Sequence, residues 1–309
     1  MNTRDIYFKT INFVWIKLLL GTITLIISGI LLAIFLGLGL LFGDGVSFVM
    51  VLIWLGATGI VRFIIMHYIG YLVKAGHIAI ITTAITTGKV PENQFEVGKE
   101  MVKERFVTSN VYFAVDKMVA GAVKQLQNVL DRAGGFLRGV PGIDAVMGAG
   151  KLFISISLGY IDECCLGYTF YKKEQNVFKS AADGVVIYAQ NWKEILKSAA
   201  VTTAMVIALL IGITLAVFLV FGLAFRLLGW NGYIAFILSV FVTFVVKFAF
   251  VDSWVMVKMM CLYMGIAPNS EITYDLYQKL SGLSPKFKDL VERGEGQKPE
   301  ASGEQVLQQ

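Results

Sequence analysis

The sequence has little charge for its length. Of its 309 residues, only 16% are Asp, Glu, Lys or Arg, whereas 56% are hydrophobic. A soluble domain carries about a quarter charged residues. The apolar residues also gather in long uninterrupted runs, which is typical of membrane-spanning helices. The shortage of charge therefore excludes an ordinary soluble protein.

Cysteine and histidine are scarce as well. Cys164 and Cys165 are adjacent, which strains a mutual disulfide, and Cys261 lies in an apolar stretch. We interpret all three as small apolar packing residues. His67 and His77 have no carboxylate or cysteine near them in the sequence, so we predict no metal site. The sequence contains no recognisable motif for a nucleophile–base pair, a metal cluster or a phosphate-binding loop, and we expect neither enzyme activity nor a cofactor.

The net charge is +5, but no basic cluster with interleaved aromatic residues is present. We therefore predict no nucleic-acid partner. We assign the positive charge to the cytoplasmic side of a protein whose main partner is the lipid bilayer.

The first apolar run extends from Leu18 to Phe42. It is longer than the apolar region of a cleavable signal, which has about 7–15 residues, so we expect a retained spanning helix. A glycine-containing turn at 43–45 leads into a second helix, Val46–Thr87, which stops at 88–91. Arg62 lies in this second helix, at a depth where a long cationic side chain reaches the inner interface.

The C-terminal third has the same order of parts. An apolar helix is followed by a turn at 229–232, a second helix that contains Lys247, and a stop at 265–268. The triplet 246–248 corresponds to 61–63 in the first hairpin. This order indicates a degenerate internal repeat with an offset of about 180 residues. The alternative is that glycine turns and interfacial cations are common to all membrane hairpins.

We therefore predict an all-α, polytopic integral membrane protein with two transmembrane hairpins and long helices that extend into a cytoplasmic helical layer. The turns carry no Lys or Arg and the flanking segments carry most of them, which places both termini in the cytoplasm. The predicted divisions are a cytoplasmic N-terminus (1–17), the first hairpin with its inward extension (18–88), an amphipathic cytoplasmic or re-entrant region (89–192), the second hairpin (193–265), C-terminal amphipathic helices (266–291) and a disordered tail (292–309).

The central stretch Lys151–Lys172 is long enough to cross a membrane, yet Asp162 and Glu163 lie at its centre. A central carboxylate costs about 2.5–3.5 kcal/mol on insertion scales. Both hairpins have the same predicted orientation, so the chain between them crosses the membrane an even number of times. This stretch therefore crosses only if 111–130 crosses as well. The favoured alternative is a cytoplasmic or re-entrant position, with the acids in water or paired with nearby basic residues.

Polar residues within these apolar segments are the candidate ligand-binding groups. Tyr160 lies one helical turn before Glu163, and carboxylates beside aromatic rings suit an organic cation. The candidate set is Asp162, Glu163, Tyr160, Tyr168, Arg62, Lys247 and Asp252.

Two short motifs carry a resemblance to a known family. The segment Asn-Val-Phe-Lys-Ser-Ala at 176–181 is similar to the Asn-Phe-…-Ser-Ala segment that precedes the last two helices of choline-transporter-like proteins. Val-Asp-Ser at 251–253 is similar to the Val-Asp-Thr of that family's last helix. The resemblance covers residues 150–265, and the chain lacks the family's long N-terminal part and large external loop. It implies transport of choline or a related amine.

We predict a transporter-like or pore-forming protein for a small solute, with a small amine or an ion as candidate solutes. The alternative is a non-enzymatic, oligomeric membrane scaffold with a helical cytoplasmic layer. A single helix from Val46 to Thr87 would be about 63 Å long, well beyond a hydrocarbon core of about 30 Å. A homo-oligomer is expected for a scaffold and for a pore.

Overall fold

The computed structural model describes residues 1–133, 160–227, 229 and 232–296. These residues are almost all helical and include no strand, which confirms the all-α class. The elements are α1 (Thr3–Lys9), α2 (Ile11–Phe42), α3 (Asp44–Ile65), the π-helical η1 (Met66–Gly70), α4 (Tyr71–Thr87), α5 (Gln94–Phe106), α6 (Ser109–Ala133), α8 (Ile161–Tyr171), α9 (Val177–Gln190), α10 (Trp192–Leu227), α11 (Gly232–Val246), the π-helical η3 (Lys247–Val251), α12 (Asp252–Ile266), the 3₁₀-helical η4 (Ala267–Asn269), α13 (Tyr274–Leu283) and α14 (Pro285–Gly296).

Four helices of the described chain are long and apolar enough to span a membrane. They are Ile11–Phe42, Gly45–Thr87, Ala204–Leu227 and Ala235–Asn269. Large apolar side chains such as Leu41 point outward from them, at 77% exposure. Burying such side chains in lipid removes the unfavourable contact of apolar surface with water. The structure therefore supports the prediction of an integral membrane protein.

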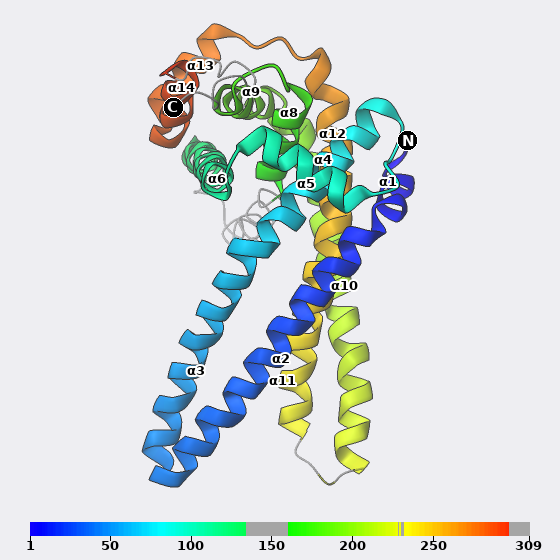
Figure 1. Ribbon diagram of the computed structural model, residues 1–309, viewed down its shortest axis with the longest axis vertical. Helices are drawn as coiled ribbons and strands as arrows, with labels where there is room; N and C mark the ends of the chain where they lie inside the picture. Colours follow the sequence, from blue (N-terminus) through cyan, green and yellow to red (C-terminus); the bar gives the residue numbers. More distant parts are fainter. Residues whose placement is uncertain (134–159, 228, 230–231, 297–309) are drawn as a thin grey trace, which may run out of the picture.

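The spanning helices lie in two pairs. Helix α2 packs along α3, and α10 packs along α11 (Figure 1). Gly43, between α2 and α3, has φ +101°, a backbone conformation that favours glycine. The pairs come together near the middle of the molecule and diverge toward their turns (Figure 1). At the meeting point Gly21 allows close approach, since a Cβ there would lie 3.0 Å from a methyl carbon of Val245.

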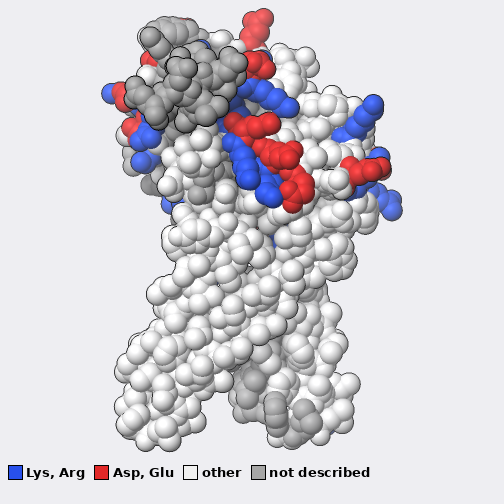
Figure 2. Space-filling view, viewed as in Figure 1, with Lys and Arg blue, Asp and Glu red and all other residues white. Residues whose placement is uncertain are grey.

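The helical cap, which comprises α5, α6, α8, α9, α13 and α14, covers the other end of the spanning helices (Figure 1). Helices α8 and α9 lie inside it and are almost entirely buried. On the face shown in Figure 2, charged side chains gather over the cap, while the spanning helices are nearly free of them. Helices α1 and α14 both lie at the cap end (Figure 1). This division matches a polar layer on an apolar membrane part.

The second spanning helix of each pair differs from the continuous helix that the sequence predicts. The expected helix Val46–Thr87 begins at Asp44 and is interrupted by η1, and the helix that contains Lys247 is interrupted by η3. A π-helical segment accommodates an additional residue in a helical turn and is frequent at functional sites. Helices α4 and α12, beyond these interruptions, continue into the cap region and are buried there.

The described segments between and after the pairs are mainly helical. The amphipathic segment 111–130 lies within α6, which packs against α8, α9 and α14 and is not among the four candidate spans. Asn93 precedes α5, and its side chain makes no capping hydrogen bond. The predicted disordered tail began at 292, but α14 continues to Gly296, and residues 297–309 lie outside the described residues.

The contact between α4 and α5 depends on two glycines, and this gives a first prediction. A Cβ on Gly98 would lie 3.0 Å from the carbonyl oxygen of Gly76 and 3.1 Å from its Cα. Because backbone cannot move aside easily, we expect Gly98→Val to lower the free energy of unfolding by about 1–3 kcal/mol. The control is Gly282→Val, at a helical position with open space around it. Equal thermal unfolding of the two variants in detergent would contradict this packing.

Candidate functional site

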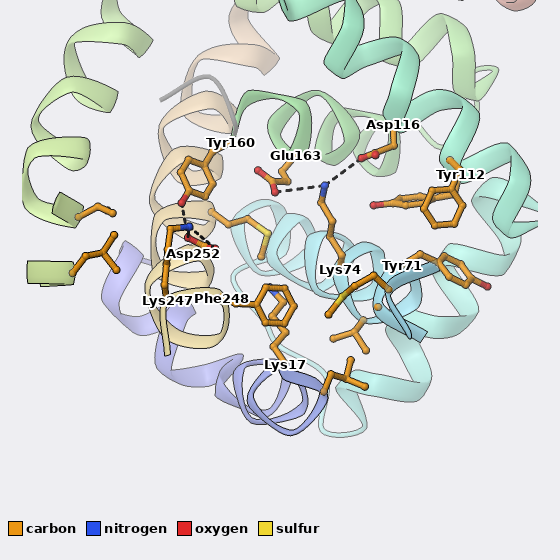
Figure 3. A pocket seen from close by; sticks show the side chains of 18 of the residues that line it. Lys17, Tyr71, Lys74, Tyr112, Asp116, Tyr160, Glu163, Lys247, Phe248 and Asp252 are labelled. Carbon is orange, nitrogen blue, oxygen red and sulfur yellow. Dashed lines mark hydrogen bonds and ion pairs between the residues drawn. The ribbon is translucent and has the colours of Figure 1, made fainter. Parts of the chain in front are cut away.

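A cavity of about 520 Å³ lies where the spanning helices enter the helical cap (Figure 3). Its wall combines groups from both parts of the molecule. Helices α2 and α4 supply lysines, α6 and α8 supply carboxylates, and the junction of η3 with α12 supplies an ion pair. The charged and phenolic lining residues are Lys17, Lys74, Tyr71, Tyr112, Asp116, Tyr160, Glu163, Lys247 and Asp252.

One ammonium group in this cavity pairs with three carboxylates. The Nζ atom of Lys74 lies 3.2 Å from Asp116 Oδ1, 3.5 Å from Asp162 Oδ2 and 3.6 Å from Glu163 Oε1. Figure 3 shows Lys74 pointing between Asp116 and Glu163. The three acidic side chains are only 13–15% exposed. A single positive charge therefore faces three largely buried acidic groups.

Several polar atoms around Lys74 are buried and make no hydrogen bond. They are Asp162 Oδ1, Glu163 Oε2 and the hydroxyl of Tyr112. Tyr112 is only 1% exposed, and its hydroxyl points toward Lys74 (Figure 3). A buried polar atom without a partner costs about 1–3 kcal/mol. Three such atoms in one place lower the stability of the fold, so this cluster is a candidate functional site.

The proton affinity of the acid pair is altered by its surroundings. Burial raises the pKa of Glu163 to about 8, and repulsion from Asp162 adds to this, while Lys74 and Lys17 oppose it. Burial also raises the pKa of Asp162, against the attraction of Lys74. Glu163 therefore keeps a proton to a higher pH than an exposed glutamate does.

A second charged group lies on the other side of the cavity. The Nζ atom of Lys247 donates to both carboxylate oxygens of Asp252, at 2.7 and 2.9 Å, and the hydroxyl of Tyr160 donates to Asp252 Oδ1 at 2.6 Å. The lysine and the aspartate are five residues apart, a spacing that an α-helix does not align. The π-helical turn of η3 brings positions i and i+5 together and so makes this pair possible.

The third lysine of the cavity has neutral partners. Lys17 Nζ lies 3.0 Å from Ser253 Oγ and 3.4 Å from His77 Nδ1, and His77 Nε2 lies 3.0 Å from Thr10 Oγ1. Lys17 is 7% exposed and makes no ion pair with any described residue. This network ties α2, α4 and α12 together at the base of the cavity.

The cavity has more carboxylates than cations and several aromatic rings. Three lysines, at 17, 74 and 247, face four acids, at 116, 162, 163 and 252. The rings of Tyr71, Tyr112, Phe113, Tyr160 and Phe248 also line it. A proton on Glu163 or a bound cation balances the excess negative charge. Among the described residues no group of His, Cys, Asp and Glu has the arrangement of a metal site.

The structure brings five of the predicted site residues to this cavity. Tyr160, Glu163, Lys247 and Asp252 line it, and Asp162 reaches it through Lys74. Tyr168 does not, because it packs inside the cap with its ring 5.7 Å from that of Tyr171. Arg62 lines a separate crevice between the helix pairs.

Sequence reasoning missed five of the charged and phenolic residues that line the cavity: Lys17, Tyr71, Lys74, Tyr112 and Asp116. For the two lysines and the aspartate, the available signal was a charged residue inside an otherwise apolar or amphipathic helix, which needs a partner from elsewhere in the fold. For the acid pair, partners were expected nearby in sequence, but the observed partner is Lys74 on α4.

The central stretch is shorter in its described part than a membrane crossing. Helix α8 has 11 residues, about 16 Å at 1.5 Å per residue, against a hydrocarbon core of about 30 Å. It lies within the cap, in contact with α4, α6, α9 and α12. Residues 151–159 of this stretch lie outside the described residues.

The fold and the cavity together define a helical protein of the integral membrane class, with a charged, aromatic cavity at the junction of its spanning helices and its cap. No protein-family model, curated protein or solved structure matches this chain.

Proposed function

We propose that the protein transports a small organic cation, such as an amine, which binds in the cavity beside Asp162 and Glu163. The observation that carries this proposal is the sharing of Lys74 among three buried acids, with two carboxylate oxygens left unpartnered. An ammonium ligand donates hydrogen bonds to these oxygens and reduces the excess negative charge. The Tyr112 hydroxyl, which is also unpartnered, supplies a further polar contact.

The aromatic lining supports an organic rather than an inorganic cation. Rings of Tyr71, Tyr112, Tyr160 and Phe248 border the cavity. A cation over such a ring gains about 0.5–2 kcal/mol, and the gain is larger where water is excluded. A quaternary ammonium such as choline, which the family resemblance implies, would depend mainly on the rings. A primary amine would depend more on the carboxylates.

A route into the membrane part is the second element of the proposal. The cavity shares Met66, Lys247, Phe248 and Asp252 with a crevice that lies between the helix pairs. The Lys247–Asp252 ion pair therefore stands on the wall between the two spaces. Opening of this pair would connect them. The cap, as the charge-rich layer, is assigned to the cytoplasmic side together with both termini.

The two π-helical segments support an internal repeat of two hairpins. Met66–Gly70 and Lys247–Val251 occupy corresponding places in the second spanning helix of each pair, about 180 residues apart. Both border the shared wall, since Met66 and Lys247 line both spaces. Related halves that move against each other around a central site are common in transporters. In this proposal the π-helical segments are the places where the helices bend.

The test is uptake of labelled choline, and its competition by a panel of small amines, with the purified protein in liposomes. A carboxylate about 4 Å from a bound cation attracts it by about 4 kcal/mol at an effective dielectric constant of about 20. Loss of that negative charge is therefore expected to lower uptake about tenfold or more in Glu163→Gln and in Asp162→Asn. The control is Glu96→Gln, which makes the same chemical change at a 61% exposed side chain outside the cavity.

Uptake that is equal in all three variants would contradict the proposal. A protein that forms a stable oligomer but moves no amine would instead favour the oligomeric scaffold.

A further inference from the structure

A second space in the molecule is not explained by cation binding. This interpair crevice has a volume of about 390 Å³ and lies between the α2–α3 pair and α11. Its polar wall is formed by Thr24, Ser28, Thr58 and Arg62. Its opposite wall is apolar and includes Phe241, Phe244 and Val245. A space with one polar and one apolar wall suits an amphiphilic ligand.

Arg62 is the charged group of this crevice that lacks a partner. Its side chain is exposed, and no described residue makes a hydrogen bond or an ion pair with it. Lys247 and Asp252 also reach the crevice, but they neutralise each other at 2.7 Å. The crevice therefore carries one uncompensated positive charge, on a planar guanidinium that matches phosphate geometry.

The depth of Arg62 agrees with the position of lipid phosphates. It lies about 27 Å along the helix from the start of α3, close to the thickness of a hydrocarbon core of about 30 Å. When the turn of the first pair is at one surface, Arg62 is near the opposite surface. A phosphate at that level lies within reach of a long arginine side chain.

Hydroxyl groups and a rigid frame surround the site. Ser28 Oγ and Thr58 Oγ1 are 2.8 Å apart, which links α2 to α3, and Trp54 Nε1 donates to the carbonyl oxygen of Ser28 at 2.8 Å. The ring of Trp54 lies 6.3 Å from that of Phe241, across the gap between the pairs. These contacts link α2 to α3 and join this pair to α11 along the crevice.

We propose that the interpair crevice binds a membrane phospholipid, with its phosphate on Arg62 and an acyl chain along the apolar wall of α11. The phosphate neutralises the unpaired guanidinium, and the chain covers apolar surface where the pairs diverge. This binding does not depend on the transport of a cation. Its loss in a variant would leave the charged cavity intact.

The test is native mass spectrometry of the detergent-purified protein with added phosphatidylglycerol. We expect Arg62→Ala to lower the affinity for phosphatidylglycerol about tenfold, which corresponds to about 1.4 kcal/mol, and Arg62→Lys to retain part of it. The matched control is Arg226→Ala, which removes an exposed arginine from a spanning helix, α10, outside the crevice. Thermal unfolding establishes that each variant is folded.

Two further ligands separate the possible sources of the phosphate. Diacylglycerol has the chains without the phosphate, and inorganic phosphate has the group without the chains. Phosphatidylglycerol binding that depends on Arg62, with weak binding of both other ligands, supports the proposal. Equal affinity of the Arg62→Ala and Arg226→Ala variants, or equal binding of diacylglycerol, overturns it. Arg62-dependent binding of inorganic phosphate without lipid binding also overturns it, since the ligand is then a soluble phosphate.

Discussion

Replacement of Lys74 by methionine is expected to lower the unfolding temperature of the protein more than any other single change to the cavity. The substitution removes the shared cation of Asp116, Asp162 and Glu163, which are only 13–15% exposed. Removing one partner of a buried ion pair costs about 3–5 kcal/mol, because the other charge stays buried. Lys74 is 31% exposed, so we expect a value near the lower end of this range. Thermal unfolding in detergent measures it.

Two comparisons test the cause of this loss. Lys99→Met removes the lysine of an exposed pair with Glu96 and should cost less than about 1 kcal/mol. Adding Asp116→Asn to the Lys74→Met variant should recover part of the stability, because the acid closest to Lys74 is then removed. Equal unfolding temperatures for Lys74→Met and Lys99→Met would contradict the assignment of Lys74 as the shared counter-ion.

The second large effect is a dependence of stability on pH that arises from Glu163. Burial raises the pKa of this carboxyl group from 4.5 to about 8, with Asp162 adding to the rise and Lys74 and Lys17 opposing it. Between these two values the folded protein holds a proton that the unfolded chain releases. Stability from this group is therefore greatest at low pH and falls as the pH rises through this window. We expect the unfolding temperature to be several degrees higher at about pH 5.5 than at about pH 8.5.

The matched variants assign the effect to one residue. Glu163→Gln cannot titrate and should lose most of the slope between the two pH values, whereas Glu96→Gln should keep the wild-type slope. A wild-type slope in Glu163→Gln would mean that another group titrates in this window.

The spanning segments could be predicted from the sequence because each is a long apolar run, and lipid imposes that composition on a helix whatever its neighbours. The interruptions η1 and η3 could not be predicted, since a π-helical turn in an apolar helix leaves no compositional signal. Amphipathic segments such as 111–130 were identified as helices by their periodicity. Their place in the cap depends on packing against α8 and α9.

The acid pair was predicted as a site because carboxylates in an apolar stretch require compensation. The partner of the acid pair was not predicted, because Lys74 meets Asp162 only through the packing of α4 against α8. The Lys247–Asp252 pair was predicted as two separate residues, since five-residue spacing does not align in an α-helix. Tyr168 was included for its closeness in sequence to the acids, but it packs away from the cavity.

The central claim is that a small organic cation binds beside Glu163, and calorimetric titration of the purified protein with choline and a panel of small amines tests it most directly. We expect at least one amine to bind to the wild type and to Glu96→Gln, and its affinity to fall about tenfold or more in Glu163→Gln. Absence of binding by every amine of the panel, or equal affinities in all three proteins, would contradict the claim.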